Sequence, residues 1–210
     1  MTVRALTNVD RVIDTYTVIT DAFADWLAAN KFTAVGRYLD NLSLAEIARL
    51  HQRNIGVFGI RTARRNGWLP TGVMGKADGL ETVQLANDLG FEDGTSISCD
   101  FEGCAPTTAA SDAIAYGSEW PALVTSRWKA MFYEGAEQPL NGTQLYMLPG
   151  FTLYWRSCSI VPSLQCGYVL AQTRPGNVLI GPAGGQVLVD IDQPETDLHF
   201  PARSVTAMFP

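Results

Sequence analysis

Two acidic residues, Asp100 and Glu102, end a short apolar stretch near the middle of the chain. The stretch is typical of a β-strand, in which successive side chains alternate between two faces, so the two acids point the same way. Ile97, Cys99 and Phe101 then face the opposite side. The α-carbons of the two acids would lie about 6.5–7 Å apart, so their carboxyl groups could share one substrate. Repulsion between the two negative charges raises the pKa of at least one of them. The alternative is a solvated strand end with two surface acids, because such a triplet is common.

The composition indicates a folded protein with a sizeable core and little attraction for nucleic acid. The chain has 210 residues, of which 47% are apolar and 17% charged, and its net charge is −6. No basic run occurs, which argues against nucleic acid as the main partner. The longest apolar runs are too short to span a bilayer, and the first ten residues lack the continuous apolar region of a signal peptide. A conventional secretory route is therefore not expected.

The cysteines and histidines give no sign of a metal centre. The chain has two histidines, His51 and His199, and neither is expected to be catalytic. Its four cysteines are Cys99, Cys104, Cys158 and Cys166. No C-x-x-C pair occurs, so we expect no zinc site, no other metal and no cofactor. Cys99 with Cys104, or Cys158 with Cys166, could close a short disulfide loop. Because no signal sequence is visible, free buried thiols are expected instead.

Apolar runs and helical periodicities alternate along the chain. Strands are predicted at 12–16, 32–39, 55–60, 96–103, 129–133, 151–156, 168–172 and 186–191. Helices are predicted at 20–30, 43–53, 77–89 and 108–120, with a Gly- and Pro-containing loop at 64–75. Ser43 and Glu46 form a capping-box pattern, and Asp78 is expected to open its helix. Pro121 is expected to break the fourth helix, and further prolines and glycines interrupt the second half.

Eight strands spaced by helices indicate an α/β fold, either a (β/α)₈ barrel or an open doubly wound sheet. We favour a small TIM-type (β/α)₈ barrel with thinned helices in its second half. No linker rich in Pro, Gly or Ser divides the chain, so residues 1–210 are predicted to form one barrel domain. The tail from residue 194 onward would cover the bottom of the barrel or contact another chain.

In a barrel of this type, the catalytic and binding residues lie at the C-terminal ends of the strands. The polar and aromatic residues at those ends are Asp14, Arg37, Arg61, Asp100, Glu102, Tyr133, Glu134, Trp155, Arg156, Gln172, Asp190 and Asp192. A ring rich in acids suits a polyhydroxylated ligand better than an apolar one. Sugars exchange hydrogen bonds with such groups and stack their flat faces on Trp or Tyr. The strand ends therefore predict a carbohydrate site.

Five short patterns occur in a set order. They are V-I-D-T at 12–15, V-G-R-Y-L at 35–39, A-D-G at 77–79, the D-x-E triplet, and V-D-I-D at 189–192. Together they resemble a glycoside-hydrolase-like family of unknown function, which is related to the family 25 lysozymes. Those lysozymes are muramidases on (β/α)₈-type barrels. The resemblance runs from about residue 12 to residue 193 and so covers most of the chain.

The resemblance implies a role for each of four acids. Glu102 matches the glutamate expected to act as general acid, which protonates the leaving oxygen of a glycosidic bond. Asp14, Asp100 and Asp190 match aspartates expected to orient the sugar and to stabilise positive charge at the anomeric carbon. Repulsion from these neighbours would raise the pKa of Glu102, while Asp100 stays ionised, paired with Arg37. Arg37 matches an arginine of the family of unknown function and not of the lysozymes.

Five further residues are predicted to bind the substrate: Arg37, Trp155, Tyr133, Gln172 and Asp192. Each also has a purely structural interpretation. Arg37 could instead pair with Asp14 and hold the rim, and Tyr133 and Trp155 could pack in the core. Because Tyr154 and Trp155 are adjacent on a strand, one must point into the barrel and the other toward the helices. Gln172 could be a hydrogen-bonding rim residue, and Asp192 could cap the last turn.

The predicted function is therefore a glycoside hydrolase that acts on a polysaccharide, with lysozyme-like cleavage of bacterial cell-wall peptidoglycan favoured. The expected partner is carbohydrate. The alternative is a glycan-binding or interaction module on the same barrel, without turnover. A third class, a phosphodiesterase-type barrel, is disfavoured by the scarcity of histidines and basic residues. Without a signal peptide, the protein would be cytoplasmic as synthesised and would reach a cell wall as a released phage lysin or an exported effector.

Overall fold

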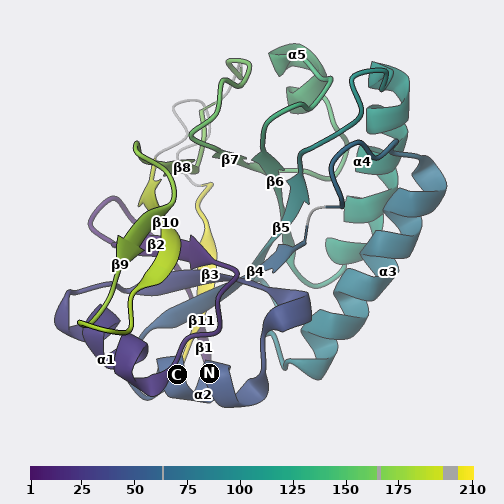
Figure 1. Ribbon diagram of the computed structural model, residues 1–210. Helices are drawn as coiled ribbons and strands as arrows, with labels where there is room; N and C mark the ends of the chain where they lie inside the picture. The colour runs from purple at the N-terminus through teal and green to yellow at the C-terminus, as the bar shows by residue number, and fades with distance from the viewer. Residues whose placement is uncertain (63, 165–166, 196–202) are drawn as a thin grey trace.

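The computed structural model describes all residues except 63, 165–166 and 196–202, and within this described part eight strands close into a barrel (Figure 1). The barrel strands are β2 (Val12–Thr15), β3 (Ala34–Tyr38), β4 (Gly56–Arg61), β5 (Ser96–Phe101), β6 (Lys129–Glu134), β7 (Leu153–Arg156), β8 (Leu170–Gln172) and β10 (Val187–Pro194). From β2 to β8 neighbouring strands are parallel, and the pairing of β4 with β5 completes the ring. The predicted small TIM-type barrel is confirmed.

The last barrel strand departs from the regular pattern. β10 runs antiparallel to both of its neighbours, β2 and β8. A parallel strand needs a long crossover, usually a helix, whereas antiparallel strands are joined by short turns. The chain between β8 and β10 forms no helix and instead contains β9 (Val178–Ile180), which pairs with β10 as a hairpin. The missing helix therefore explains the reversed direction of β10.

Helices α3 and α4 lie side by side at the right of the barrel in Figure 1, whereas α1 and α2 lie in the lower part of the view and α5 at the top. Their bounds are α1 (Asp21–Ala29), α2 (Leu44–His51), α3 (Gly72–Asp88), α4 (Ala110–Val124) and α5 (Gly142–Tyr146), with a short 3₁₀ turn η1 (Leu39–Asn41). After β6 the described residues form only the single-turn α5, which agrees with the expected thinning of the helices. None of these helices is both long and apolar enough to cross a membrane.

Helix α3 begins earlier than predicted, because two glycines that suggested a loop are contact points between helices. Thr71 caps α3 by accepting a hydrogen bond from the Met74 amide, so the helix begins at Gly72, five residues before the predicted start at 77. A Cβ at Gly75 would collide with the backbone of Tyr116 on α4. Asp78 therefore lies inside the helix and is buried, so the prediction that it opens the helix is wrong.

Helix α4 also contradicts a prediction. Pro121 was expected to break it, yet α4 continues to Val124 with Pro121 inside it. The proline lacks one N–H donor, but its carbonyl still accepts from the Thr125 amide at 2.9 Å. Trp120 and Val124 on either side are fully buried, so packing holds this last turn against the barrel.

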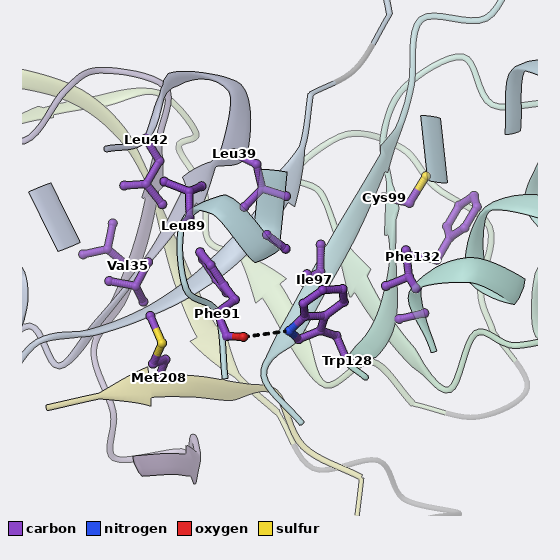
Figure 2. Close-up of a cluster of buried hydrophobic side chains, with 14 of the residues drawn as sticks. Val35, Leu39, Leu42, Leu89, Phe91, Ile97, Cys99, Trp128, Phe132 and Met208 are labelled. Carbon is purple, nitrogen blue, oxygen red and sulfur yellow. Dashed lines mark hydrogen bonds between the residues drawn. The ribbon is translucent and has the colours of Figure 1, made fainter. Parts of the chain in front are cut away.

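Apolar side chains fill two spaces, the interior of the barrel and the layer between barrel and helices. Figure 2 shows part of the outer layer, where Ile97 and Cys99 of β5 face the helix side and the Trp128 indole donates to the Phe91 carbonyl at 3.3 Å. Phe101 belongs to the same layer. The alternation predicted for this strand is confirmed, and Asp100 points to the opposite face, into the barrel.

Two terminal strands close the bottom of the barrel. β1 (Thr2–Ala5) and β11 (Thr206–Phe209) pair antiparallel, and the two chain ends lie together in Figure 1. The Thr206 amide donates to Ser96 Oγ at 2.9 Å, at the start of β5, and Phe209 packs on Gly56 at the start of β4. The described part of the tail therefore covers the bottom of the barrel, one of the two predicted placements. His199 lies outside the described residues.

Candidate active site

Side chains from both ends of the sequence meet at the C-terminal ends of the parallel strands. Asp14 on β2 and Asp190 on β10 are direct partners across the antiparallel pair. The Gln172 side chain at the end of β8 links them, because its Nε2 lies 3.2 Å from Asp14 Oδ2 and 3.2 Å from Asp190 Oδ2. Gln172 Oε1 accepts from the Tyr133 hydroxyl at 3.1 Å. Four of the predicted site residues thus form one connected group.

Asp14 and Asp192 form a buried carboxyl pair beneath this group. Their residues are only 4% and 2% exposed. Burial, followed by the negative charge of Asp190, raises the pKa of Asp14 to about 7. Burial and the charge of Asp14 raise the pKa of Asp192 as well. The pair therefore loses its last proton at a higher pH than an isolated aspartate.

Asp100 lies near the end of β5 and Glu102 follows the strand, and the charges of both act on the Tyr133 hydroxyl. The Tyr38 hydroxyl donates to Asp100 Oδ2 at 3.5 Å. Glu102, one residue beyond the strand, is partly exposed. Burial raises the pKa of Glu102, the charges of Asp190 and Glu137 raise it further, and a hydrogen bond with the Ala136 backbone opposes them. Glu102 therefore keeps its proton to higher pH than an ordinary glutamate.

All four predicted catalytic acids lie close enough to Tyr133 for their charges to act on its hydroxyl. Burial raises the pKa of the Tyr133 hydroxyl, and the charges of four acids add to this effect. These acids are Asp100, Glu102, Asp14 and Asp190. Tyr133 faces this mouth from β6, with its ring 4.7 Å from the Trp155 ring between centroids. The structure thus brings together the acids that the sequence assigned to different strands.

A loop between β4 and α3 holds Glu102 in place. The Trp68 indole donates to the Glu102 carbonyl at 2.8 Å, and the Gly67 amide donates to the Gly103 carbonyl at 2.7 Å. Gly103 has a φ of +68°, a conformation that favours glycine. On the other side, a Cβ at Gly135 would collide with the Glu102 side chain. The acid is therefore held from two directions.

Trp155 lies below the site and offers no surface to a ligand. It points into the barrel while Tyr154 points outward, as the alternation required. Trp155 is only 1% exposed, its ring packs on Phe58, and its indole donates to Asp192 Oδ1 at 3.0 Å. This residue supports the buried carboxyl pair and is not accessible for stacking on a sugar.

Arg37 is also removed from the mouth. It is fully buried and forms an ion pair with Glu46 of α2, with 2.6 Å between Nε and Oε1. The predicted pairings of Arg37 with Asp14 or Asp100 are therefore wrong. Ser43 caps α2 through the Glu46 amide, but the Glu46 side chain does not return to complete the capping box. It turns inward and also accepts from the Ile19 amide at 3.2 Å.

An open pocket of about 180 Å³ lies beside the acids. Asp14 and Asp190 line it together with Tyr16, Tyr38 and Asn177. These last three residues were not among the predicted site residues. The two tyrosines follow or end the first and second parallel barrel strands, so the rule of strand ends could have identified them. Asn177 belongs to the connection between β8 and β9 and carries no comparable signal in the sequence.

His51 lies away from the mouth, whereas Cys158 adjoins it, because the Cys158 amide donates to Gln172 Oε1 at 3.1 Å. Cys99 and Cys104 are buried free thiols, as expected, and burial raises the pKa of Cys104 to about 12. Cys166 lies outside the described residues. His51 faces the Met208 carbonyl at 3.1 Å, at the bottom of the barrel. Among the described residues, no three His, Cys, Asp or Glu side chains form a group that could hold a metal ion.

Comparison with known proteins identifies the fold. No protein-family profile and no curated protein sequence matches the chain. An uncharacterised Bacillus stearothermophilus protein is 15% identical with a TM-score of 0.67, over 89% of this chain and 96% of that one. A bacterial lysozyme from Streptomyces coelicolor is 11% identical with a TM-score of 0.58, over 91% and 94%.

The modular autolysin LytC from Streptococcus pneumoniae, solved in complex with a synthetic peptidoglycan ligand, is also similar. It is 14% identical with a TM-score of 0.57, over 87% of this chain and 46% of the autolysin. The chain thus spans about half the length of that protein. The barrel fold expected from the resemblance to lysozymes is confirmed.

Proposed function

We propose that this chain is a glycoside hydrolase that cleaves a bacterial cell-wall polysaccharide by lysozyme-like chemistry. The observation that carries the proposal is the group of acids from β2, β5 and β10 at one open mouth, where burial and mutual repulsion raise the pKa of Asp14 and of Glu102. Glycosidic cleavage needs one protonated and one ionised carboxyl group at the scissile bond. The shared fold with a lysozyme and with an autolysin solved with a peptidoglycan ligand supports cell-wall glycan as the substrate class.

Glu102 is the proposed general acid. It is partly exposed, so it can reach a ligand, and its raised pKa keeps the proton that the leaving oxygen must receive. The Trp68 hydrogen bond to its carbonyl and the close packing of Gly135 fix the direction of its side chain. A fixed acid loses little entropy when the bond breaks.

The aspartates are proposed to act on the developing positive charge and on the sugar hydroxyls. Asp100 faces the mouth beside the Tyr38 hydroxyl and would stabilise the oxocarbenium-like transition state. Asp190, oriented by Gln172 and by the Asn177 amide at 2.5 Å, would accept hydrogen bonds from the sugar. The buried pair of Asp14 and Asp192 would hold Gln172 and Trp155 in place from below.

The test is the Glu102→Gln variant. We expect it to release reducing sugar from purified peptidoglycan about 10²–10⁴-fold more slowly than the wild type, because it lacks the proton donor. Glu119→Gln, the same exchange at an exposed position of α4, is the matched control and should retain full activity. Both variants should unfold at the wild-type temperature.

Two outcomes would contradict the proposal. Release of reducing sugar by Glu102→Gln at the wild-type rate would exclude Glu102 as the general acid. Binding of peptidoglycan by the wild type without any turnover would instead identify a glycan-binding module on the same barrel.

A further inference from the structure

Only one large aromatic side chain in the described part of the mouth is substantially exposed. Tyr16, directly after β2, is 53% exposed, whereas the predicted stacking residue Trp155 is 1% exposed. Tyr16 lines the open pocket next to Asp14 and Asp190. Building on the proposed function, we propose that the Tyr16 ring is the stacking surface of a saccharide subsite in this pocket.

The Tyr16 ring packs against a second aromatic ring. Its centroid lies 5.3 Å from that of Tyr38, and the planes meet at 61°, an edge-to-face contact. Tyr38 in turn reaches Asp100 through its hydroxyl. A sugar ring that stacks on Tyr16 would therefore lie next to the acids proposed to act on the adjacent glycosidic bond.

The backbone around Tyr16 is fixed before any ligand binds. The Asn41 side-chain amide donates to the Tyr16 carbonyl at 2.5 Å, and the Thr15 hydroxyl donates to the Leu188 carbonyl at 2.8 Å. The buried Arg37 guanidinium donates to the Thr15 carbonyl, and its partner Glu46 accepts from the Ile19 amide. Such preorganisation lowers the entropy cost of binding. Arg37 and Glu46 thus act behind the ring as positioning residues.

The rest of the pocket is polar. Asp190 lies across from Tyr16 among the lining residues and is held by the Asn177 amide and by Gln172. A ligand here needs one apolar face for the ring and hydroxyl donors for the carboxylate. A pyranose has both, whereas a purely apolar ligand would leave Asp190 without hydrogen-bond donors from the ligand. The pocket chemistry therefore selects a saccharide.

Affinity for a defined oligosaccharide tests the subsite. Chitotetraose binding is measured by calorimetry in the Glu102→Gln background, which stops turnover. We expect Tyr16→Ala to bind about tenfold more weakly, and Tyr16→Phe, which keeps the ring, to bind within about twofold of Tyr16. Leu80→Ala on α3 is the matched control, because Leu80 is 54% exposed and remote from the pocket, and should not change binding. On peptidoglycan, Tyr16→Ala in the otherwise unchanged protein should raise KM about tenfold.

The outcomes separate this inference from the proposed function. Unchanged chitotetraose affinity in Tyr16→Ala, with turnover still lost in Glu102→Gln, overturns the subsite and leaves the hydrolase intact. A wild type that neither binds chitotetraose nor cleaves peptidoglycan overturns both. Tyr16→Leu keeps apolar volume without an aromatic ring, so it should behave like Tyr16→Ala; wild-type affinity in Tyr16→Leu would show that stacking is not involved. Matching unfolding temperatures exclude a folding defect.

Discussion

At the scale of single residues, burial decides which carboxyl groups hold a proton. Asp14 and Asp192 are almost fully enclosed, and the pKa of each is raised mainly by loss of contact with water. Glu102 remains partly exposed and its pKa is raised through burial and through its acidic neighbours. Burial thus raises the pKa of the enclosed pair Asp14 and Asp192 and of Glu102 at the mouth, the acid proposed as proton donor.

The raised pKa of Asp14 predicts how stability varies with pH. Unfolded, its carboxyl group loses the proton near the ordinary value of 3.8, whereas in the folded protein the pKa is about 7. The folded state therefore binds more protons between these values, and the free energy of unfolding falls as the pH rises from about 4 to 7. Asp14→Asn should flatten this slope.

Urea unfolding at a series of pH values measures the effect. Glu119→Gln, which changes an exposed acid, should keep the wild-type slope. An Asp14→Asn protein whose stability still falls by the wild-type amount over this range would exclude Asp14 as the source.

At the scale of elements, the strands could be predicted from the sequence but several helix boundaries and one strand direction could not. Apolar runs with period two are a local property, and they located all eight barrel strands within a few residues. Gly72 and Gly75 were assigned to the predicted loop, because their role depends on how closely α4 approaches α3. The direction of β10 likewise depends on the β9 hairpin, whose three-residue strand gives little signal.

The ion-pair partner of Arg37 likewise could not be predicted from the sequence. Strand ends correctly located the acids, since alternation along β5 and β10 fixes which way they point. The sequence also placed Arg37 at a strand end, but its partner was decided by α2, which turns Glu46 inward. Tyr16 was missed and the burial of Trp155 was left as one of two alternatives, because both depend on the packing of the mouth.

The buried ion pair between α2 and β3 gives a second stability prediction. Arg37→Met leaves Glu46 buried without its charged partner, so the free energy of unfolding should fall by about 3–5 kcal/mol. The double variant Arg37→Met/Glu46→Leu should recover most of this loss, because it removes both charges. Denaturant unfolding measures each value.

A surface pair provides the control. Arg127 Nε lies 2.6 Å from Asp93 Oδ1, but the two side chains are 43% and 70% exposed. Arg127→Met should therefore lower the free energy of unfolding by no more than about 1 kcal/mol. Equal losses in Arg37→Met and Arg127→Met would show that burial does not set the strength of the Arg37 pair.

At the scale of the whole molecule, the two ends of the barrel differ in structure. The acids, the open pocket and the Tyr16 ring lie at the C-terminal ends of the parallel strands. The other end is sealed by β1 and β11, two short terminal strands that the sequence analysis did not predict. Val205, Ala207 and Phe209 enter the apolar interior from below. In barrels of this kind the bottom contributes to stability and the top carries chemistry.

Phe209 tests this separation. Its side chain packs on Gly56, lies under the Arg4 guanidinium at 4.4 Å and is 7% exposed, so Phe209→Ala should lower the free energy of unfolding by about 3 kcal/mol. Below the unfolding transition, kcat and KM on peptidoglycan should equal the wild-type values, because the mouth is at the opposite end. A fall in kcat/KM in the fully folded variant, as judged by circular dichroism, would mean that the floor of the barrel also positions the acids.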